Sequence, residues 1–194
     1  MNEAITLFGL PTTPMELLSF ALAVITVLLT IRQNHWAWLF TIVSSATYAV
    51  VFYNAKLYGD MSLQFMFIGA AFWGWYQWLR GGADHGELKV SRLSRKGIAS
   101  SAVAWLVLFG AVAMLLSRFT DTDVAYPDAF LTAGSLVGQV LLARKKLENW
   151  VVWIIVDILY VGLYVYKDLM FTAILYAIFI ALAAQGLRVW RRAL

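Results

Sequence analysis

Apolar residues fall into seven long runs along the chain, separated by short polar segments. The runs cover residues 15–31, 36–53, 61–79, 98–117, 129–143, 149–166 and 170–187. Most approach the roughly 20 residues that an α-helix needs to cross about 30 Å of hydrocarbon. The fifth run is short and rich in glycine, so we expect that helix to pack among its neighbours. The pattern predicts an all-α integral membrane protein with seven transmembrane helices.

The composition supports this prediction and excludes some chemistry. Apolar residues make up 62% of the chain and charged residues 13%, whereas a soluble domain is about half apolar and about a quarter charged. There is no cysteine, which excludes disulfides, thiol catalysis and cysteine-ligated metals. The segment before the first run carries Glu3 and no basic residue, so we interpret the first run as a retained helix and not a cleaved signal.

Basic residues alternate between the two ends of the predicted helices. If the N-terminus lies outside, the inside segments hold 12 of the 15 lysines and arginines, and the outside segments hold only Lys56, Arg118 and Lys167. This distribution follows the positive-inside rule. An even number of helices would not fit the alternation of basic segments, so seven helices are favoured over six or eight. We therefore expect a multi-pass protein of the cytoplasmic (inner) membrane with its C-terminus inside. The basic loop 80–96 is then a topology signal, and we expect no nucleic acid partner.

A single gapless shift of the sequence aligns a set of similar positions in its two halves. The shift that places Trp38 on Trp150 also places Tyr48 on Tyr160, Leu57 on Leu169, Gly74 on Gly186 and Trp78 on Trp190. Chance is the alternative, because helices rich in tryptophan and tyrosine produce coincidences. We favour two parallel three-helix repeats, a 3+1+3 arrangement like that of the SWEET sugar carriers. The predicted units are an N-terminal region with the first repeat at 1–80, a basic loop and linker helix at 81–119, and a second repeat with a basic tail at 120–194.

The sixth run carries a polar and aromatic stripe on one helical face. Spacings of three and four residues align Trp150, Trp153, Asp157, Tyr160 and Tyr164. A carboxylate inside the bilayer costs about 3 kcal/mol unless it faces water or a partner, so we interpret Asp157 as functional. The alternative is a protonated aspartate in a hydrogen bond between helices. Asp157 is the one acidic residue that we predict inside a span, since Asp121, Asp123 and Asp128 fall in an expected outer loop.

The second run carries a matching stripe that is polar but uncharged. It consists of Trp38, Thr41, Ser45, Tyr48 and Phe52. The two stripes would give a central cavity unequal walls, which suits an asymmetric substrate. We expect Gln64 to line that cavity and Gln139 to serve packing. Aromatic faces above a carboxylate favour a flat cation, although tryptophan is also common at membrane interfaces without a ligand.

The sequence gives little support to catalysis. His35 and His85 fall in or beside loops, and no zinc, nucleophile-elbow or phosphate-loop motif occurs. Paired carboxylates inside the spans are not expected either, so the pattern indicates neither an acid–base enzyme nor an ion-coupling site. We predict a protein that is not an enzyme and has no cofactor and no metal site.

Two segments resemble a known family. The run Glu148–Asp157 resembles the W-x-x-W-x-x-x-N/D signature of PnuC-type vitamin transporters. The segment Trp73–Trp78 resembles their Y-G-W-Y-x-W motif, and the charged turn 144–149 also looks like theirs. The resemblance extends from about residue 20 to Trp190. It implies a seven-helix core of two three-helix repeats and, by analogy with the family, a homotrimer.

The resemblance also implies a function and a site. Family members take up nicotinamide riboside by facilitated diffusion, and a cytoplasmic kinase traps it by phosphorylation; relatives carry thiamine or riboflavin. Trp150 and Trp153 would contact the vitamin ring, position 157 the ribose hydroxyls, and Gln64 would line the site. Tyr160, Tyr48 and Trp38 complete the predicted substrate-binding set.

The substrate remains open at this point. This chain has aspartate at position 157, where the best-known riboside carriers have asparagine. An anionic Asp157 suits either nicotinamide riboside or thiamine and suits neutral riboflavin less. A sugar carrier and a sensor that binds without transporting are the further alternatives.

Overall fold

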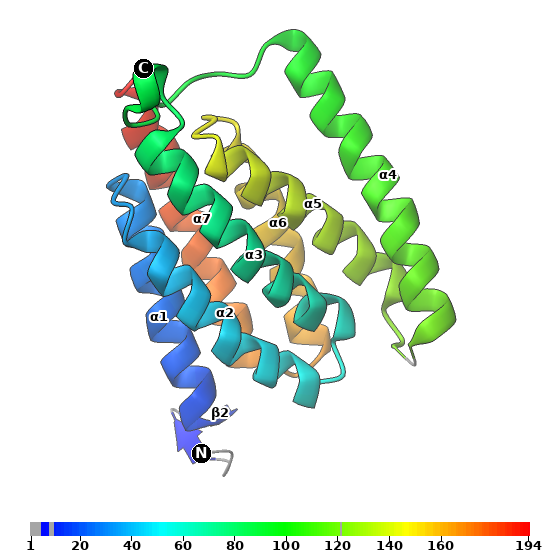
Figure 1. Cartoon of the computed structure of the whole chain (residues 1–194). Coiled ribbons are helices and arrows are strands. Elements are labelled where there is room, and N and C mark those ends of the chain that lie inside the picture. Colours follow the sequence, from blue (N-terminus) through cyan, green and yellow to red (C-terminus); the bar gives the residue numbers. More distant parts are fainter. Residues whose placement is uncertain (1–4, 8–9, 121) are drawn as a thin grey trace.

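Seven α-helices make up most of residues 5–7, 10–120 and 122–194, which the structure, a computed structural model, describes (Figure 1). They are α1 (Pro14–Ile31), α2 (Ala37–Asn54), α3 (Tyr58–Arg80), α4 (Arg95–Phe119), α5 (Ala125–Ala143), α6 (Asn149–Tyr166) and α7 (Met170–Arg191). Each helix coincides within a few residues with one of the apolar runs. The all-helical prediction is therefore confirmed for the bundle.

Two smaller elements were not predicted. Strands β1 (Ile5–Leu7) and β2 (Leu10–Thr12) pair antiparallel before the first helix. A short 3-10 helix, η1 (Ala83–His85), lies in the basic loop. Neither carries an apolar run, so the hydrophobic pattern contained no signal for them.

The helices differ in how much lipid they can face. Within the described residues, α2, α4, α6 and α7 are long and apolar enough to cross a membrane, and α1 contributes a shorter apolar stretch at Leu17–Ile31. Twelve of the 19 residues of α5 are buried, as expected for a helix packed among neighbours. Its glycines allow close contact, because Trp105 of α4 lies against Gly134 and Trp153 of α6 lies against Gly138.

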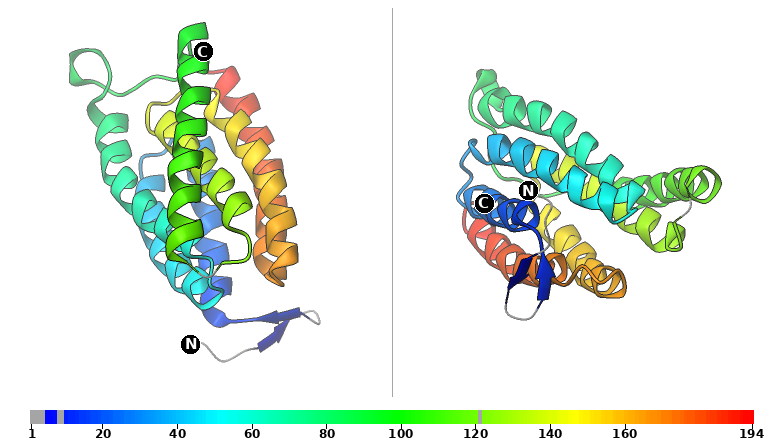
Figure 2. Two further views of the ribbon diagram at one scale, coloured as in Figure 1. Left: turned by 90° about the vertical axis from the view of Figure 1, so that its right-hand side faces the viewer. Right: turned by 90° about the horizontal axis from the view of Figure 1, so that it is seen from below.

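The two ends of the bundle have different character. We call the end that holds the C-terminus, loop 81–94 and turn 144–148 the basic end. We call the opposite end, which holds β1 and β2, the hairpin end. Figure 1 shows these ends at the top and bottom of the bundle. In Figure 2, α4 lies in front of the other helices in the left view and at the edge of the bundle in the right view.

Four tight turns between helices share one backbone geometry. In each turn one residue has a positive φ near 50°, and these residues are Gln33, Lys56, Lys145 and Asp168. The N–H of that residue donates to the carbonyl three positions back, and the next N–H donates five positions back. This pattern satisfies carbonyls that would otherwise be free at a helix end. The shift that places Trp38 on Trp150 also pairs turn 33 with turn 145 and turn 56 with turn 168.

The basic loop is docked on the bundle. The N–H of Ser91 donates to the carbonyl of Lys145, and the N–H of Leu147 donates back to the carbonyl of Ser91. Glu148 accepts a further bond of 2.9 Å from the N–H of Leu93. Burial lowers the pKa of Lys145, whose ammonium lies 4.7 Å from the ring centre of Trp78. Part of this segment therefore has a structural role in addition to its predicted role as a topology signal.

Candidate functional site

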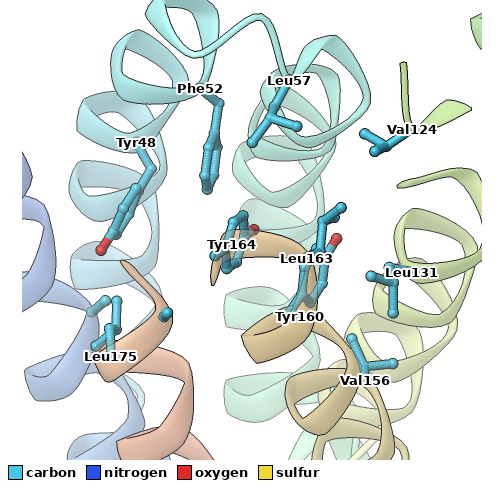
Figure 3. Close-up of a cluster of buried hydrophobic side chains, with 12 residues drawn as sticks. Tyr48, Phe52, Leu57, Val124, Leu131, Val156, Tyr160, Leu163, Tyr164 and Leu175 are labelled. Carbon is cyan, nitrogen blue, oxygen red and sulfur yellow. The ribbon is translucent and has the colours of Figure 1, made fainter. Parts of the chain in front are cut away.

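A cavity of about 140 Å³ lies inside the bundle, and every α-helix except α4 contributes to its wall. Near the basic end it meets a cluster of buried tryptophans, Trp38, Trp78, Trp150 and Trp190. Near the hairpin end it meets a cluster rich in tyrosine and phenylalanine, shown in Figure 3. The cavity therefore lies between two aromatic layers.

Five of the seven predicted site residues line this cavity. They are Trp150, Trp153, Asp157, Gln64 and Tyr48. Three successive turns of α6 supply the first three, because positions 150, 153 and 157 share one face of the helix. The structure brings these residues together, and their contact with a substrate remains a prediction.

The other two predicted residues lie outside the cavity wall. Trp38 is buried in the basic-end cluster, where it packs against Gly74 and meets Trp78 edge-on at 5.3 Å. The hydroxyl of Tyr160 donates a 2.7 Å hydrogen bond to Asp60. Both side chains face a neighbouring helix. The sequence could not show this, because helical periodicity identifies which residues share a face and not what that face contacts.

Asp157 is the most unusual group in the cavity wall. The residue is only 3% exposed, and among the described residues its carboxyl group has neither a hydrogen bond nor an ion pair. No lysine, arginine or histidine is among the described residues that line the cavity. A buried carboxylate without a partner is costly, so the site is chemically suited to a group that is cationic or rich in hydrogen-bond donors.

The tryptophans of α6 are held by close packing. Trp150 lies against Gly186 of α7, where a side chain larger than hydrogen would meet the indole ring. Trp153 meets Phe67 of α3 edge-on, with ring centres 6.1 Å apart. Rings fixed in this way offer a flat substrate a preorganised surface.

Hydroxyl groups give the opposite wall its polarity. Thr26, Thr30 and Thr41 line the cavity and donate their hydroxyl protons to carbonyls of their own helices at 2.8–2.9 Å. Their oxygens remain available as acceptors. Gln139 also lines the cavity, whereas the sequence favoured a packing role for it. A single amide in an apolar run does not indicate whether its side chain lines a cavity or packs between helices.

Two further carboxylates are buried near the hairpin end, so the prediction that paired acidic residues are absent from the spans is wrong. Asp60 in the first turn of α3 accepts hydrogen bonds from the hydroxyls of Tyr160 and Tyr164, at 2.7 and 3.3 Å. Asp128 lies in the first turn of α5 and not in an outer loop, and it accepts a 3.2 Å bond from Thr132. Asp60 fell just before an apolar run, and its partners are 100 and 104 residues away. The sequence pattern therefore contained no sign of this site.

Four stacked rings lie near the hairpin end of the bundle (Figure 3). Ring centres are 5.3 Å apart for Tyr48 and Phe52, 5.8 Å for Phe52 and Tyr164, and 5.1 Å for Tyr164 and Tyr160. The stack joins α2 to α6, and Asp60 ties it to α3. Since Tyr48 also lines the cavity, this stack covers the cavity toward the hairpin end.

Comparison with known proteins decides the family. The sequence profile described as "Nicotinamide mononucleotide transporter" matches residues 13–192. The chain belongs to this transporter family. Membership agrees with the resemblance to PnuC-type transporters read from the tryptophan motifs.

Individual relatives give detail on similarity. The riboflavin/roseoflavin transporter RibM of Streptomyces davaonensis is 30% identical over 97% of this chain and 90% of its own length. The nicotinamide riboside transporter PnuC of Escherichia coli is 24% identical over 78% of this chain and 74% of its own length. The crystal structure of the vitamin B3 transporter PnuC has the same fold, with a TM-score of 0.79 and 22% identity over 92% of this chain and 81% of that one.

Membership of this family defines the function in outline. The chain is a vitamin transporter and not an enzyme, and it is a multi-pass protein of the inner membrane. The cavity between the aromatic layers is its candidate substrate site.

Proposed function

We propose that this protein carries nicotinamide riboside into the cell by facilitated diffusion across the cytoplasmic membrane. The observation that carries the proposal is Asp157 beside Trp150 and Trp153, in a cavity whose described wall holds no basic group. Nicotinamide riboside joins a flat pyridinium cation to a ribose. Aromatic faces attract such a cation by about 0.5–2 kcal/mol per contact.

Each part of the substrate has a counterpart in the wall. The tryptophan rings would contact the pyridinium ring. Asp157 would accept hydrogen bonds from ribose hydroxyls and complement the positive charge, with Gln64 as a further partner. Tyr48 would close the site toward the hairpin end.

The charge of the cavity bears on the choice between related substrates. A mononucleotide would bring a phosphate dianion beside Asp157, with no described basic residue to bind it. Uptake of the riboside avoids this repulsion. Cytoplasmic phosphorylation would then trap the vitamin, because the phosphorylated product no longer fits the cavity.

Riboflavin is the second candidate substrate. The 30% identity to a riboflavin/roseoflavin transporter over almost the whole chain favours it. Its isoalloxazine ring is flat and would also stack on tryptophan, but it is neutral and leaves the charge of Asp157 uncompensated. Thiamine, a second flat cation, would satisfy the same residues as the riboside.

We further propose that the bundle consists of two parallel three-helix repeats, 1–80 and 120–194, joined by the unit 81–119. Reciprocal contacts support this arrangement. The indole N–H of Trp78 donates to the carbonyl of Leu142 at 3.1 Å, and that of Trp190 donates to the carbonyl of Thr30 at 3.3 Å. The shift that places Trp78 on Trp190 also places Thr30 on Leu142, so donors and acceptors correspond. One unit rocking against the other would give alternating access to the cavity.

Orientation and assembly complete the proposal. The positive-inside rule puts the basic end in the cytoplasm and the hairpin end outside, with the N-terminus outside and the C-terminus inside. We propose a homotrimer, as the family resemblance implies.

Transport by purified protein in liposomes tests this proposal. We expect saturable entry of labelled nicotinamide riboside that stops at equal concentrations inside and outside. Trp153→Ala should abolish entry, while Trp36→Ala, at a position that is 49% exposed and outside the cavity wall, should not. Entry of riboflavin alone or of thiamine alone would reassign the substrate. Accumulation of unmodified vitamin under a proton or sodium gradient would contradict facilitated diffusion.

A further inference from the structure

A second hollow lies between α4 and α5 at the basic end, and it is distinct from the vitamin cavity. Close contact between Trp105 and Gly134 joins the two helices, and the indole N–H of Trp105 donates to the carbonyl of Phe130 at 2.9 Å. From that contact α4 diverges from α5 toward the basic end, as Figure 1 shows. A groove of about 290 Å³ occupies the space between them.

The groove has an apolar wall and a basic mouth. Ala70, Leu108, Leu136 and Val140 line it along the helices, and Arg144 and Lys146 line it where α5 ends. Val140 is 42% exposed, so the groove opens to the outer surface of the bundle and not to its interior.

The basic residues at the mouth are held in position. The guanidinium carbon of Arg144 lies 5.7 Å from the ring centre of Trp73. The ammonium of Lys146 donates a 2.8 Å bond to Ser91, which leaves two of its three protons for another acceptor. No acidic residue is among the described residues that line the groove.

We propose that this groove binds one anionic phospholipid, with its phosphate at Arg144 and Lys146 and an acyl chain along α4 and α5. An amphiphile fits both halves of the groove, because basic pockets between transmembrane helices bind anionic headgroups and apolar walls accept acyl chains. Gln139 lines both the groove and the vitamin cavity, so the bound lipid rests against the wall of the transport site.

Thermal unfolding of the full chain in neutral detergent tests this site, with phosphatidylglycerol and phosphatidylcholine of identical acyl chains as probes. We expect phosphatidylglycerol to raise the unfolding temperature by about 3–5 °C at a tenfold excess over its dissociation constant, and phosphatidylcholine to do much less. Replacing both basic residues, Arg144→Gln with Lys146→Gln, should weaken phosphatidylglycerol binding about 30-fold. The control pair Arg188→Gln with Arg191→Gln removes the same charge from the basic end outside the groove and should keep the shift.

A second variant separates loss of binding from loss of folding. Ser101→Trp fills the groove from α4 and keeps both basic residues, so it should also abolish the phosphatidylglycerol shift. Equal shifts of the unfolding temperature with both lipids would overturn the proposal. So would a loss of phosphatidylglycerol binding in the control pair as large as the loss in Arg144→Gln with Lys146→Gln. An equal shift with glycerol phosphate alone would overturn the lipid as the occupant. Retention of the full shift in Ser101→Trp would place binding elsewhere and also overturn it.

Discussion

The half of the bundle that contains α1–α3 and the half that contains α5–α7 agree near the basic end and differ around the cavity. Trp38 meets Trp78 at 5.3 Å and 81°, and Trp150 meets Trp190 at 5.3 Å and 88°. The first tryptophan of each pair lies against a glycine and has no acceptor for its N–H among the described residues. The second donates to the main chain of the opposite half.

Around the cavity the two halves present different side chains at corresponding positions. Ser45 corresponds to Asp157, Thr41 to Trp153 and Gln64 to Tyr176, and all six line the cavity. Tightly packed positions tolerate little change in volume, whereas positions that face a cavity can change without disturbing the bundle. We propose that the two halves keep one backbone arrangement as repeats and that substrate selection lies mainly in α6.

The largest effect should come from the ring at position 153. Trp153→Ala removes an aromatic surface of the cavity and should weaken binding of the vitamin by about 2–3 kcal/mol, which is about 30- to 150-fold. Its counterpart Thr41→Ala should change binding by less than about threefold, because the Thr41 proton is already bonded within its own helix. Calorimetric titration checks both variants. Equal losses would mean that the two walls share the substrate equally.

The next largest effect is expected at the glycines that lie against a tryptophan ring in both halves. Gly74→Ala and Gly186→Ala each place a methyl group against a tryptophan ring and should each destabilise the fold by about 1–3 kcal/mol. Gly162→Ala, where no atom lies within 4 Å of the added methyl group, should not lower stability. Thermal unfolding in detergent measures all three. Destabilisation at only one of the two buried glycines would break the proposed equivalence of the halves.

A smaller effect on stability is expected in the ring stack, where the second half has a tyrosine at the position of a phenylalanine in the first half. Tyr164 corresponds to Phe52, and its hydroxyl donates to Asp60 at 3.3 Å. Tyr164→Phe removes that bond and should cost about 0.5–1.5 kcal/mol in unfolding free energy, measured by thermal unfolding in detergent. Tyr53→Phe is the control, because Tyr53 is 61% exposed on α2 and should tolerate the loss of its hydroxyl. An equal loss in both variants would show that the bond to Asp60 does not support the ring stack.

The smallest effect concerns an ion pair at the end of α6. Lys167 pairs with Asp123 and holds the pKa of that carboxyl below its ordinary value of 3.8. Because the folded-state pKa is lowered, the stabilisation is present above that ordinary value and is lost as the pH falls through the lower folded-state pKa. The Asp123 side chain is 54% exposed, so Asp123→Asn should leave the unfolding temperature at pH 7 unchanged within error. A clear drop at pH 7 would show that this pair anchors α6 to the loop before α5.

The sequence predicted the helices well and the polar partners poorly. Apolar runs locate the helices because a membrane helix presents an apolar surface along its whole length to lipid or to other helices. All seven helices lie within a few residues of their predicted bounds. The stripe of Trp150, Trp153 and Asp157 was predictable because residues three and four apart share a helical face. Which helix that face meets is a property of tertiary packing.

Three particular residues illustrate what periodicity leaves out. Tyr160 shares the stripe of Asp157 but bonds to Asp60 on α3, 100 residues away. Asp60 and Asp128 lie in first turns of helices, where a carboxylate is ordinarily exposed to water. Their burial arises because α3, α5 and α6 converge at the hairpin end, and no local pattern encodes that convergence.

Binding of nicotinamide riboside and riboflavin to the protein and to Asp157→Asn, followed by tryptophan fluorescence, tests the central claim most directly. We expect the native chain to bind the riboside, the variant to bind it about tenfold more weakly, and riboflavin affinity to stay the same or rise. The asparagine keeps the shape of the side chain, removes its charge and replaces one acceptor oxygen by an NH2 donor, so packing effects are small. A variant that binds the riboside as tightly as the native chain does, or a native chain that binds riboflavin alone, would contradict selection of a cation by the carboxylate of α6.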